Sequence, residues 1–155
     1  MWNKDRSLLL SIIVCFFLTV VLSLALFFGP WAVELWFTSY RGYAESGSAV
    51  KNIMTVFNTC FYSCVPFAYL TLYSLLRLLF NIKNDEVFIT SNVKYLRRIS
   101  WCCLIVAVIT FVGGIFYLPL IFMAVAAAFV GLMLRIVKNV MQSAVELKTE
   151  NELTI

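Results

Sequence analysis

Three long stretches of the chain carry no charged side chain: residues 7–33, 52–76 and 99–134. A helix rises about 1.5 Å per residue, so about 20 apolar residues cross the roughly 30 Å of hydrocarbon in a bilayer. The first two stretches therefore predict one membrane-spanning helix each. The third would be roughly 54 Å long as a single helix, and Gly113, Gly114 and Pro119 offer a turn that divides it. The pattern predicts four spans, at residues 7–28, 53–76, 98–114 and 117–137.

Beyond the fourth predicted span, apolar residues continue to recur with helical spacing. They fall within an arc of about 140° on a helical wheel: Ile136, Val137, Val140, Met141, Ala144 and Leu147. The fourth helix is therefore predicted to continue over residues 138–150, roughly 20 Å into the cytoplasm. The opposite side carries Glu146 and Glu150, which anionic lipid headgroups would repel. We therefore expect the apolar side of this segment to contact protein.

Two partners for this amphipathic helix remain open from the sequence. One is the inner loop, residues 77–97, in which Thr90 or Ser91 is expected to cap a helix beginning near Asn92. The other is a soluble cytoplasmic protein or a second copy of the chain. Under either interpretation, the candidate docking residues are Val87, Phe88, Ile89, Lys94, Arg97, Arg98, Val140, Met141, Ala144, Glu146, Leu147 and Glu150.

The second predicted span carries a polar stripe. Its members fall within about 60° of one another when the chain is wound as a helix: Thr55, Asn58, Tyr62, Tyr69 and Tyr73. Because hydroxyl and amide groups are costly against lipid, this face is expected to point into the bundle. It supplies either interhelical hydrogen bonds or the lining of a pocket for a small molecule or peptide.

The composition and the distribution of charge give the topology. With 63% hydrophobic and 13% charged residues, the chain lies far from the averages of soluble domains. Of its 12 Lys and Arg residues, only Arg41 and Lys51 fall on the side of the membrane opposite the N-terminus in a four-span chain. The positive-inside rule therefore predicts that both termini are cytoplasmic. The net charge of +4 is then a topology signal, and it gives no indication of nucleic-acid binding.

Two further segments have an expected role in the membrane. The first apolar run is longer than the core of a signal peptide, so we expect it to remain as an anchor. The outer loop, residues 29–52, is rich in aromatic residues, and its residues 31–40 are expected to form a short helix in the interface. Small residues on the last two spans predict that these helices pack closely: Thr110, Gly114, Ala124, Ala127, Ala128 and Gly131.

The residue types argue against catalysis. The chain has no histidine, and no Asp, Glu, Lys or Arg lies within the membrane core of a predicted span. The usual general base, the usual metal ligand and the buried carboxylate of a proton-coupled exporter are therefore missing. Cys60 and Cys64 are expected at a different membrane depth from Cys102 and Cys103, too far away for a disulfide. We predict that the protein is no enzyme and uses no cofactor or metal.

Two regions resemble a known family. The first has PF at residues 66–67, LY at 72–73 and LL at 75–76, followed by VF at 87–88, NV at 92–93 and LRRIS at 96–100. The second is the ending, with VKNV at 137–140, AVEL at 144–147 and ENELTI at 150–155. These motifs resemble the YoaS-like bacterial membrane proteins (domain of unknown function 2975). Members are small four-span proteins, often encoded beside a short Cro/CI-like helix-turn-helix protein. The resemblance implies membrane-linked control of a transcription regulator, and it supplies no catalytic residues.

Taken together, these patterns predict an all-α, four-helix bundle of the bacterial plasma membrane, with a fourth helix that extends into the cytoplasm. The expected function is regulatory: the inner loop and the C-terminal helix bind a small cytoplasmic helix-turn-helix protein. One alternative is a small permease or peptide-immunity protein that uses the polar stripe. Another is a structural membrane subunit without a ligand. The expected partners are the bilayer, the regulator and, as a further candidate, a second copy of the chain.

Overall fold

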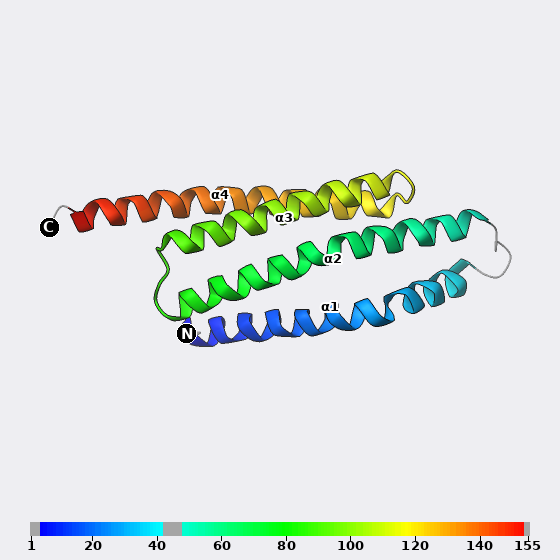
Figure 1. Ribbon diagram of the computed structural model, residues 1–155, viewed down its shortest axis with the longest axis horizontal. Helices are drawn as coiled ribbons and strands as arrows, with labels where there is room; N and C mark the ends of the chain where they lie inside the picture. Colours follow the sequence, from blue (N-terminus) through cyan, green and yellow to red (C-terminus); the bar gives the residue numbers. More distant parts are fainter. Residues whose placement is uncertain (1–3, 42–47, 154–155) are drawn as a thin grey trace.

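The computed structural model describes residues 4–41 and 48–153, and these residues form four helices (Figure 1). The helices are α1, Lys4–Arg41; α2, Ser48–Lys83; α3, Thr90–Gly114; and α4, Pro119–Leu153. Consecutive helices run in opposite directions along the long axis of the molecule. Each helix is long and apolar enough to cross a membrane. The predicted all-α bundle with four candidate spans is confirmed.

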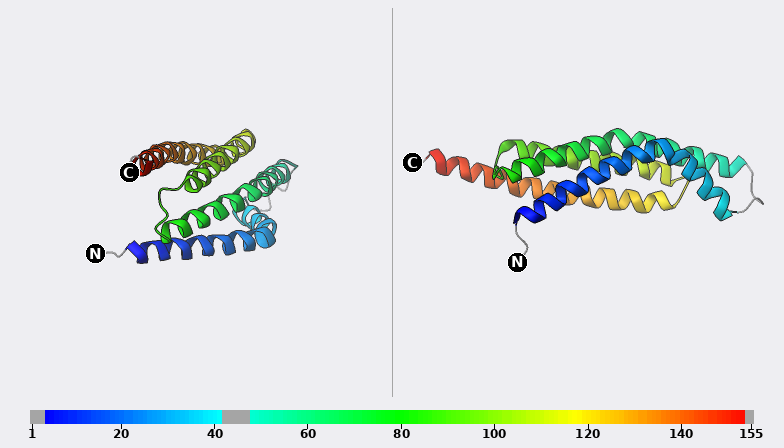
Figure 2. Two further views of the ribbon diagram at one scale, coloured as in Figure 1. Left: turned by 60° about the vertical axis from the view of Figure 1, so that its left-hand side comes forward. Right: turned by 90° about the horizontal axis from the view of Figure 1, so that it is seen from below.

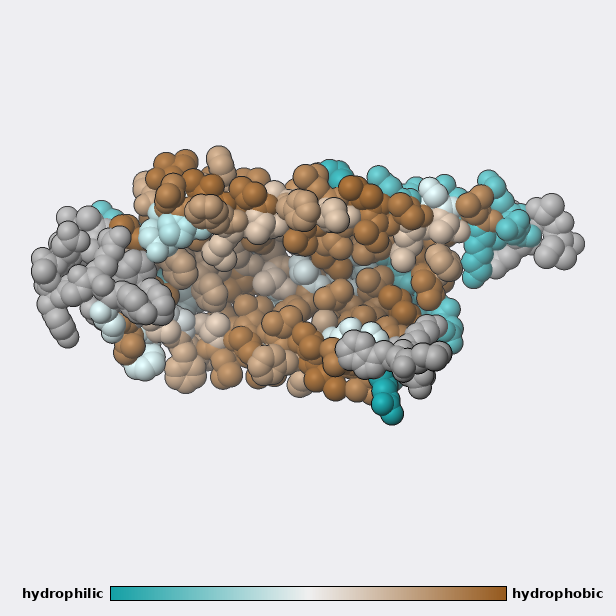
Figure 3. All heavy atoms as spheres, turned by 180° about the vertical axis from the view of Figure 1, so that it is seen from behind, coloured by the Kyte–Doolittle hydropathy of each residue, from teal (hydrophilic) through white to brown (hydrophobic). Residues whose placement is uncertain are grey.

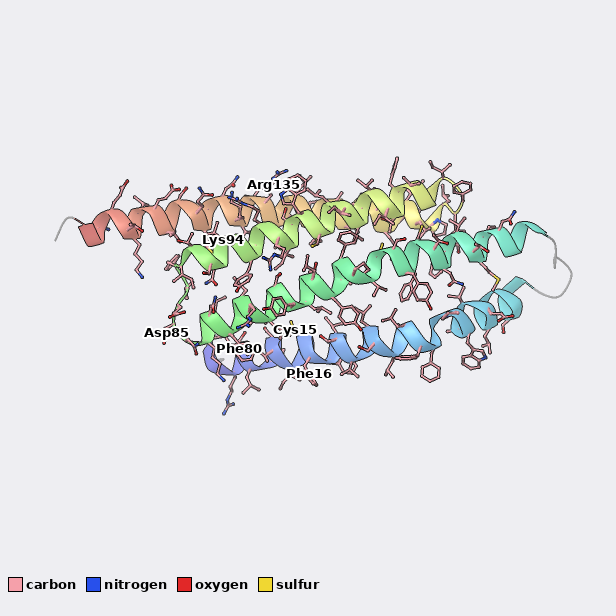
Figure 4. All side chains as sticks on the ribbon, in the orientation of Figure 1. Cys15, Phe16, Phe80, Asp85, Lys94 and Arg135 are labelled. Carbon is pink, nitrogen blue, oxygen red and sulfur yellow. The ribbon has the colours of Figure 1, made fainter. Side chains whose placement is uncertain are left out.

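The helices pack in chain order, α1 on α2, α2 on α3 and α3 on α4, and the last pairing is the most extensive. Buried apolar side chains accordingly gather on the last two helices: Val93, Leu96, Ile99, Cys102, Ala107, Leu120 and Ala124. Among the described side chains of α1, only Cys15 is buried, and Phe16 lies on the other side of the helix (Figure 4). Helix α1 therefore lies at the edge of the bundle and turns most of its apolar surface outward, as contact with lipid requires.

Helices α3 and α4 form a tight hairpin because small residues let their backbones approach. The turn lies between Gly114 and Pro119, and proline suits the first position of a helix. Across the interface, the hydroxyl of Ser100 donates a buried hydrogen bond to the carbonyl oxygen of Gly131 at 2.8 Å. A Cβ added at Gly131 would lie 3.2 Å from the Cβ of Cys103. The close packing predicted from the small residues is confirmed.

A polar clasp holds the turn between α2 and α3. The side chain of Asn92 is fully buried, and its amide nitrogen donates to the backbone carbonyls of Glu86 and Val87, both at 2.8 Å. Its side-chain oxygen accepts a hydrogen bond from the amide of Asn81 at 2.7 Å. One side chain on α3 therefore joins the last turn of α2 to the loop that follows it.

The start of α3 differs from the prediction. We expected Thr90 or Ser91 to cap a helix that begins near Asn92, whereas α3 begins at Thr90 and its cap residue is Ile89. The side chain of Ile89 makes no hydrogen bond to the first N–H groups of the helix. The expectation of a Thr90 or Ser91 cap is wrong because the chain is already helical at both residues. The polar side chain with a structural role here is Asn92, whose amide donates hydrogen bonds to carbonyl groups of the loop.

The segment between the first two spans contains more helix than the sequence indicated. We expected an outer loop at residues 29–52 with a separate short helix at residues 31–40, but α1 continues through Pro30 to Arg41. Figure 2 shows that the last part of α1 bends away from the rest. A proline inside a helix removes one backbone hydrogen bond and bends it without ending it, which accounts for the continuation. The turn expected near residues 45–48 lies mostly outside the described residues.

Candidate functional site

Charged side chains gather at one end of the molecule, where the α2–α3 turn lies and from which α4 projects. We call this the charged end and define it as residues 77–98 and 135–150. Figure 3 shows hydrophilic atoms there, next to a long apolar surface. Figure 4 shows Asp85, Lys94 and Arg135 in this half of the molecule, on three successive parts of the chain. The apolar surface suits the hydrocarbon of a membrane, and the charged end suits its headgroups and the water beyond.

A groove of about 460 Å³ lies between the start of α3 and the end of α4. We call it the tail groove, and its walls are Thr90, Val93, Lys94, Arg97, Gln142, Val145, Glu146, Thr149 and Glu150. The structure therefore brings together two of the predicted cations, Lys94 and Arg97, and the predicted carboxylates of the tail. Opposite charges on the two helices favour this alignment of α4 along α3.

The apolar residues of the tail do not enter this groove. Val140 is 67% exposed and Leu147 is 63% exposed, while Met141 and Ala144 are half-buried. The groove contains Val145 instead, which lies outside the predicted apolar arc. Packing of the tail's apolar side on the inner loop, one of the two alternatives left open by the sequence, therefore does not cover its two most exposed residues.

The register of α4 explains this orientation. Helix α4 continues without a break from the membrane to Leu153, so the side that Gly131 turns toward α3 recurs about every 3.6 residues. Gln142, Val145 and Thr149 return to that side, which makes them the residues of the groove. Val140 and Leu147 lie roughly 160–180° away from Gly131, on the outer side of the helix. The sequence contains this information. It becomes visible only when one helical wheel is drawn through the fourth span and the tail together.

The short apolar cluster of the inner loop also lies apart from the tail groove. Phe88 is 48% exposed, and Val87 and Ile89 are half-buried. The Asn92 amide holds this loop through the carbonyl oxygen of Val87. The fold therefore gives a fixed backbone to an exposed aromatic side chain at the charged end.

Two further hollows flank Trp101, and sequence analysis did not identify them. One, of about 350 Å³, lies between α2 and α3 and is lined by Phe67, Leu70, Lys94, Arg97, Arg98, Trp101, Cys102 and Ile105. The other, of about 310 Å³, is lined by Arg97, Ser100, Trp101, Arg135 and Lys138. The guanidinium carbon of Arg135 lies 5.1 Å from the centre of the Trp101 ring. The available signal was the spacing of Arg97, Arg98 and Trp101, which places two cations one turn before an aromatic ring.

The polar stripe of α2 divides into three parts. The hydroxyl of Tyr69 lies 2.8 Å from that of Ser23 on α1, and Tyr62 donates to the carbonyl oxygen of Leu26 at 3.2 Å. Tyr73 is half exposed and accepts a hydrogen bond from Arg77 on its own helix. A shallow hollow of about 550 Å³ takes the rest of the stripe, lined by Thr55, Asn58, Thr59, Tyr62 and Ser63. The stripe thus joins α1 to α2 at two points and opens outward at its start.

The described residues offer little for redox or metal chemistry. All the cysteines are free thiols, and Cys60 contacts the carbonyl oxygen of Ile109 at 3.9 Å. Within residues 4–41 and 48–153, no group of three or more His, Cys, Asp or Glu side chains is placed to hold a metal ion.

Comparison with known proteins gives a family. No curated protein and no solved structure matches the chain. Residues 38–155 match a family described as "Protein of unknown function (DUF2975)", and this match includes α2, α3, α4 and therefore the whole charged end. With four helices suited to a bilayer, the protein is a multi-pass membrane protein, and it belongs to the DUF2975 family.

Proposed function

We propose that this protein is a regulatory protein of the bacterial plasma membrane that holds a small cytoplasmic helix-turn-helix transcription regulator. The docking surface is the outer side of the α4 extension together with the exposed Phe88 of the inner loop. The observation that carries the proposal is the exposure of Val140 and Leu147 on α4, whose end projects beyond the other three helices (Figure 1). An apolar side chain as far from the hydrocarbon as Leu147 favours a protein partner.

The position of Leu147 makes lipid an unsuitable cover for this surface. Arg135 stacks on Trp101 and marks the headgroup level, and Leu147 follows it by twelve residues, roughly 18 Å of helix. Glu146 and Glu150 lie beside it on the tail, and anionic headgroups repel them. We call the exposed apolar side of the tail, which contains Val140 and Leu147, the ridge. A ridge with carboxylates beside it suits a partner protein whose surface is basic.

A DNA-binding protein has such a surface, because it must neutralise phosphates with Lys and Arg. An acidic helix that occupies this surface competes with DNA, so docking at the membrane keeps the regulator from its operator. The resemblance to YoaS-like proteins, which are often encoded beside a Cro/CI-like protein, supports this choice of partner.

The test is co-purification of the full chain with a small Cro/CI-like helix-turn-helix protein in mild detergent. Leu147→Glu places a charge in the centre of the ridge and is expected to reduce recovery of the partner by about tenfold or more. Thr149→Glu adds the same charge at an exposed position on the opposite side of the same helix and should leave recovery within about twofold, since exposed sites of this kind change little. Equal recovery with wild type and Leu147→Glu would reject the proposal.

The hollow at Thr55, Asn58 and Tyr62 supports a second candidate, a small permease or peptide-immunity protein. For this function, Asn58→Ala should abolish uptake or resistance, while Leu147→Glu should have no effect. Tyr69→Phe is the matched control because it removes the hydrogen bond to Ser23 outside the hollow. If neither Asn58→Ala nor Leu147→Glu changes uptake, resistance or recovery of the partner, a purely structural subunit is favoured.

A further inference from the structure

The hollow between α2 and α3 has two chemically different ends. Lys94, Arg97 and Arg98 line the end nearest the α2–α3 turn, and Phe67, Leu70 and Ile105 line the rest. Along α3, Lys94 and Ile105 are eleven residues apart, which is roughly 16 Å of helix. That length is about the hydrocarbon thickness of one leaflet, half of roughly 30 Å.

The cationic end has an excess of positive charge. Five cations line the three hollows of the charged end, namely Lys94, Arg97, Arg98, Arg135 and Lys138. The carboxylates among the lining residues are Glu146 and Glu150, and both belong to the tail groove. In the described part of the chain, neither hollow beside Trp101 has an acidic residue in its wall. The walls of these two hollows therefore carry a net positive charge, which a bound anion would neutralise.

The side chains of this end are also supported by aromatic rings. The guanidinium carbon of Arg98 lies 5.9 Å from the centre of the Tyr95 ring, and Arg135 stacks on Trp101. Such contacts hold a guanidinium in place while its N–H groups remain available to an anion. Guanidinium groups bind phosphate oxygens with two parallel hydrogen bonds, so phosphate is the anion that these residues suit.

We propose that the α2–α3 hollow is a binding site for an anionic phospholipid. The phosphate lies among Lys94, Arg97 and Arg98, and one acyl chain follows Phe67, Leu70 and Ile105 toward the membrane centre. A free phosphate ion would use only the cationic end and leave the apolar track uncovered. In the orientation predicted by the distribution of Lys and Arg, the lipid comes from the inner leaflet, where basic pockets between helices take such headgroups.

Arg98 is the residue with which to test this site, because it lines the α2–α3 hollow and neither of the other two at the charged end. Its replacement therefore does not alter the tail groove or the ridge at Leu147. A failure of the lipid site and a failure of the docking proposal can be distinguished by this choice.

The experiment is native mass spectrometry of the full chain in mild detergent, titrated with phosphatidylglycerol, phosphatidylcholine or inorganic phosphate. Phosphatidylglycerol is expected to bind at least about tenfold more tightly than phosphatidylcholine, since the choline ammonium of the latter neutralises its phosphate and is repelled by the cations of the hollow. Arg98→Gln should weaken phosphatidylglycerol binding about fivefold, and Leu70→Trp, which fills the apolar track, should weaken both lipids. Lys83→Gln, at an exposed cation of the same end outside the hollow, should change binding by less than about twofold.

Three results would overturn the proposal. The first is equal affinity for the two lipids, because the cationic end would then have no role. The second is displacement of phosphatidylglycerol by millimolar inorganic phosphate, which would show a soluble anion as the ligand. The third is an equal effect of Lys83→Gln and Arg98→Gln, which would show a diffuse attraction of lipid to the charged end.

Discussion

The side chain of Asn92 is fully buried and makes three hydrogen bonds. Asn92 and its three partners therefore satisfy one another's hydrogen-bonding groups in place of water. The carbonyl groups of Glu86 and Val87 receive its amide protons, and the amide of Asn81 donates to its oxygen. A buried polar group that loses its partner costs more free energy than the bond itself contributed. The conformation of the α2–α3 turn therefore rests on this residue.

Asn92→Leu, which keeps a side chain branched at Cγ but makes no hydrogen bond, is expected to lower the free energy of unfolding by about 2–3 kcal/mol. The measurement is denaturant unfolding of the purified protein in detergent. Asn84→Leu, at an exposed position of the same turn, should change stability by less than about 0.5 kcal/mol. An equal effect of the two substitutions would show that the clasp contributes little.

The sequence indicated a turn at this point but not the role of Asn92. A run of Thr, Ser and Asn before an apolar stretch predicts a helix start, and α3 does start there. Which of the three side chains reaches a backbone group depends on the path of residues 84–89. That path is determined by packing of α2 against α3, which local pattern does not contain.

At the scale of elements, the α3–α4 hairpin depends on the absence of a side chain at Gly131. The carbonyl oxygen of Gly131 accepts the buried bond from Ser100, and Cys103 and Leu104 lie against its Cα hydrogens. Helices in a membrane associate by such close packing, because lipid tails remove the hydrophobic drive that operates in water. A larger residue here must separate the two helices or move Leu104.

Gly131→Val is therefore expected to destabilise the hairpin by about 1–3 kcal/mol, the usual range for an overpacked interface. Ala126→Val is the matched control, since Ala126 is an exposed residue of the same helix. The quantity to measure is resistance to unfolding in a sodium dodecyl sulfate titration, followed by circular dichroism. A Gly131→Val protein as stable as the control would contradict close packing at this point.

The four spans followed from local apolar stretches of the sequence, whereas the orientation of the tail depends on residues in two separate segments of α4. The number of spans depends on the number and length of the apolar stretches, which can be read directly from the sequence. The face of the tail toward α3 depends on Gly131, several turns earlier in the same rigid helix. The apolar arc left open whether Val140 and Leu147 face the inner loop or a partner, and the register of α4 turns both outward.

At the scale of the whole molecule, four antiparallel helices place the α2–α3 turn and the end of α4 at the same end. All the cations of residues 77–98 and 135–148 then lie on one side of the apolar surface, with Trp101 at its border. Moving such a set of charges through a bilayer is costly, and cytoplasmic segments retain Lys and Arg for this reason. The charged end is therefore expected to face the cytoplasm.

Reporter fusions test this orientation and the number of spans together. Green fluorescent protein fused after Ile155 should fluoresce, because it folds in the cytoplasm, and alkaline phosphatase fused there should be inactive. Alkaline phosphatase inserted after Gly47, between α1 and α2, should be active because an odd number of spans precedes it. Activity at both positions would mean that one helix does not cross. Activity after Ile155 alone would place the ridge at Leu147 on the outside, where no transcription regulator can reach it.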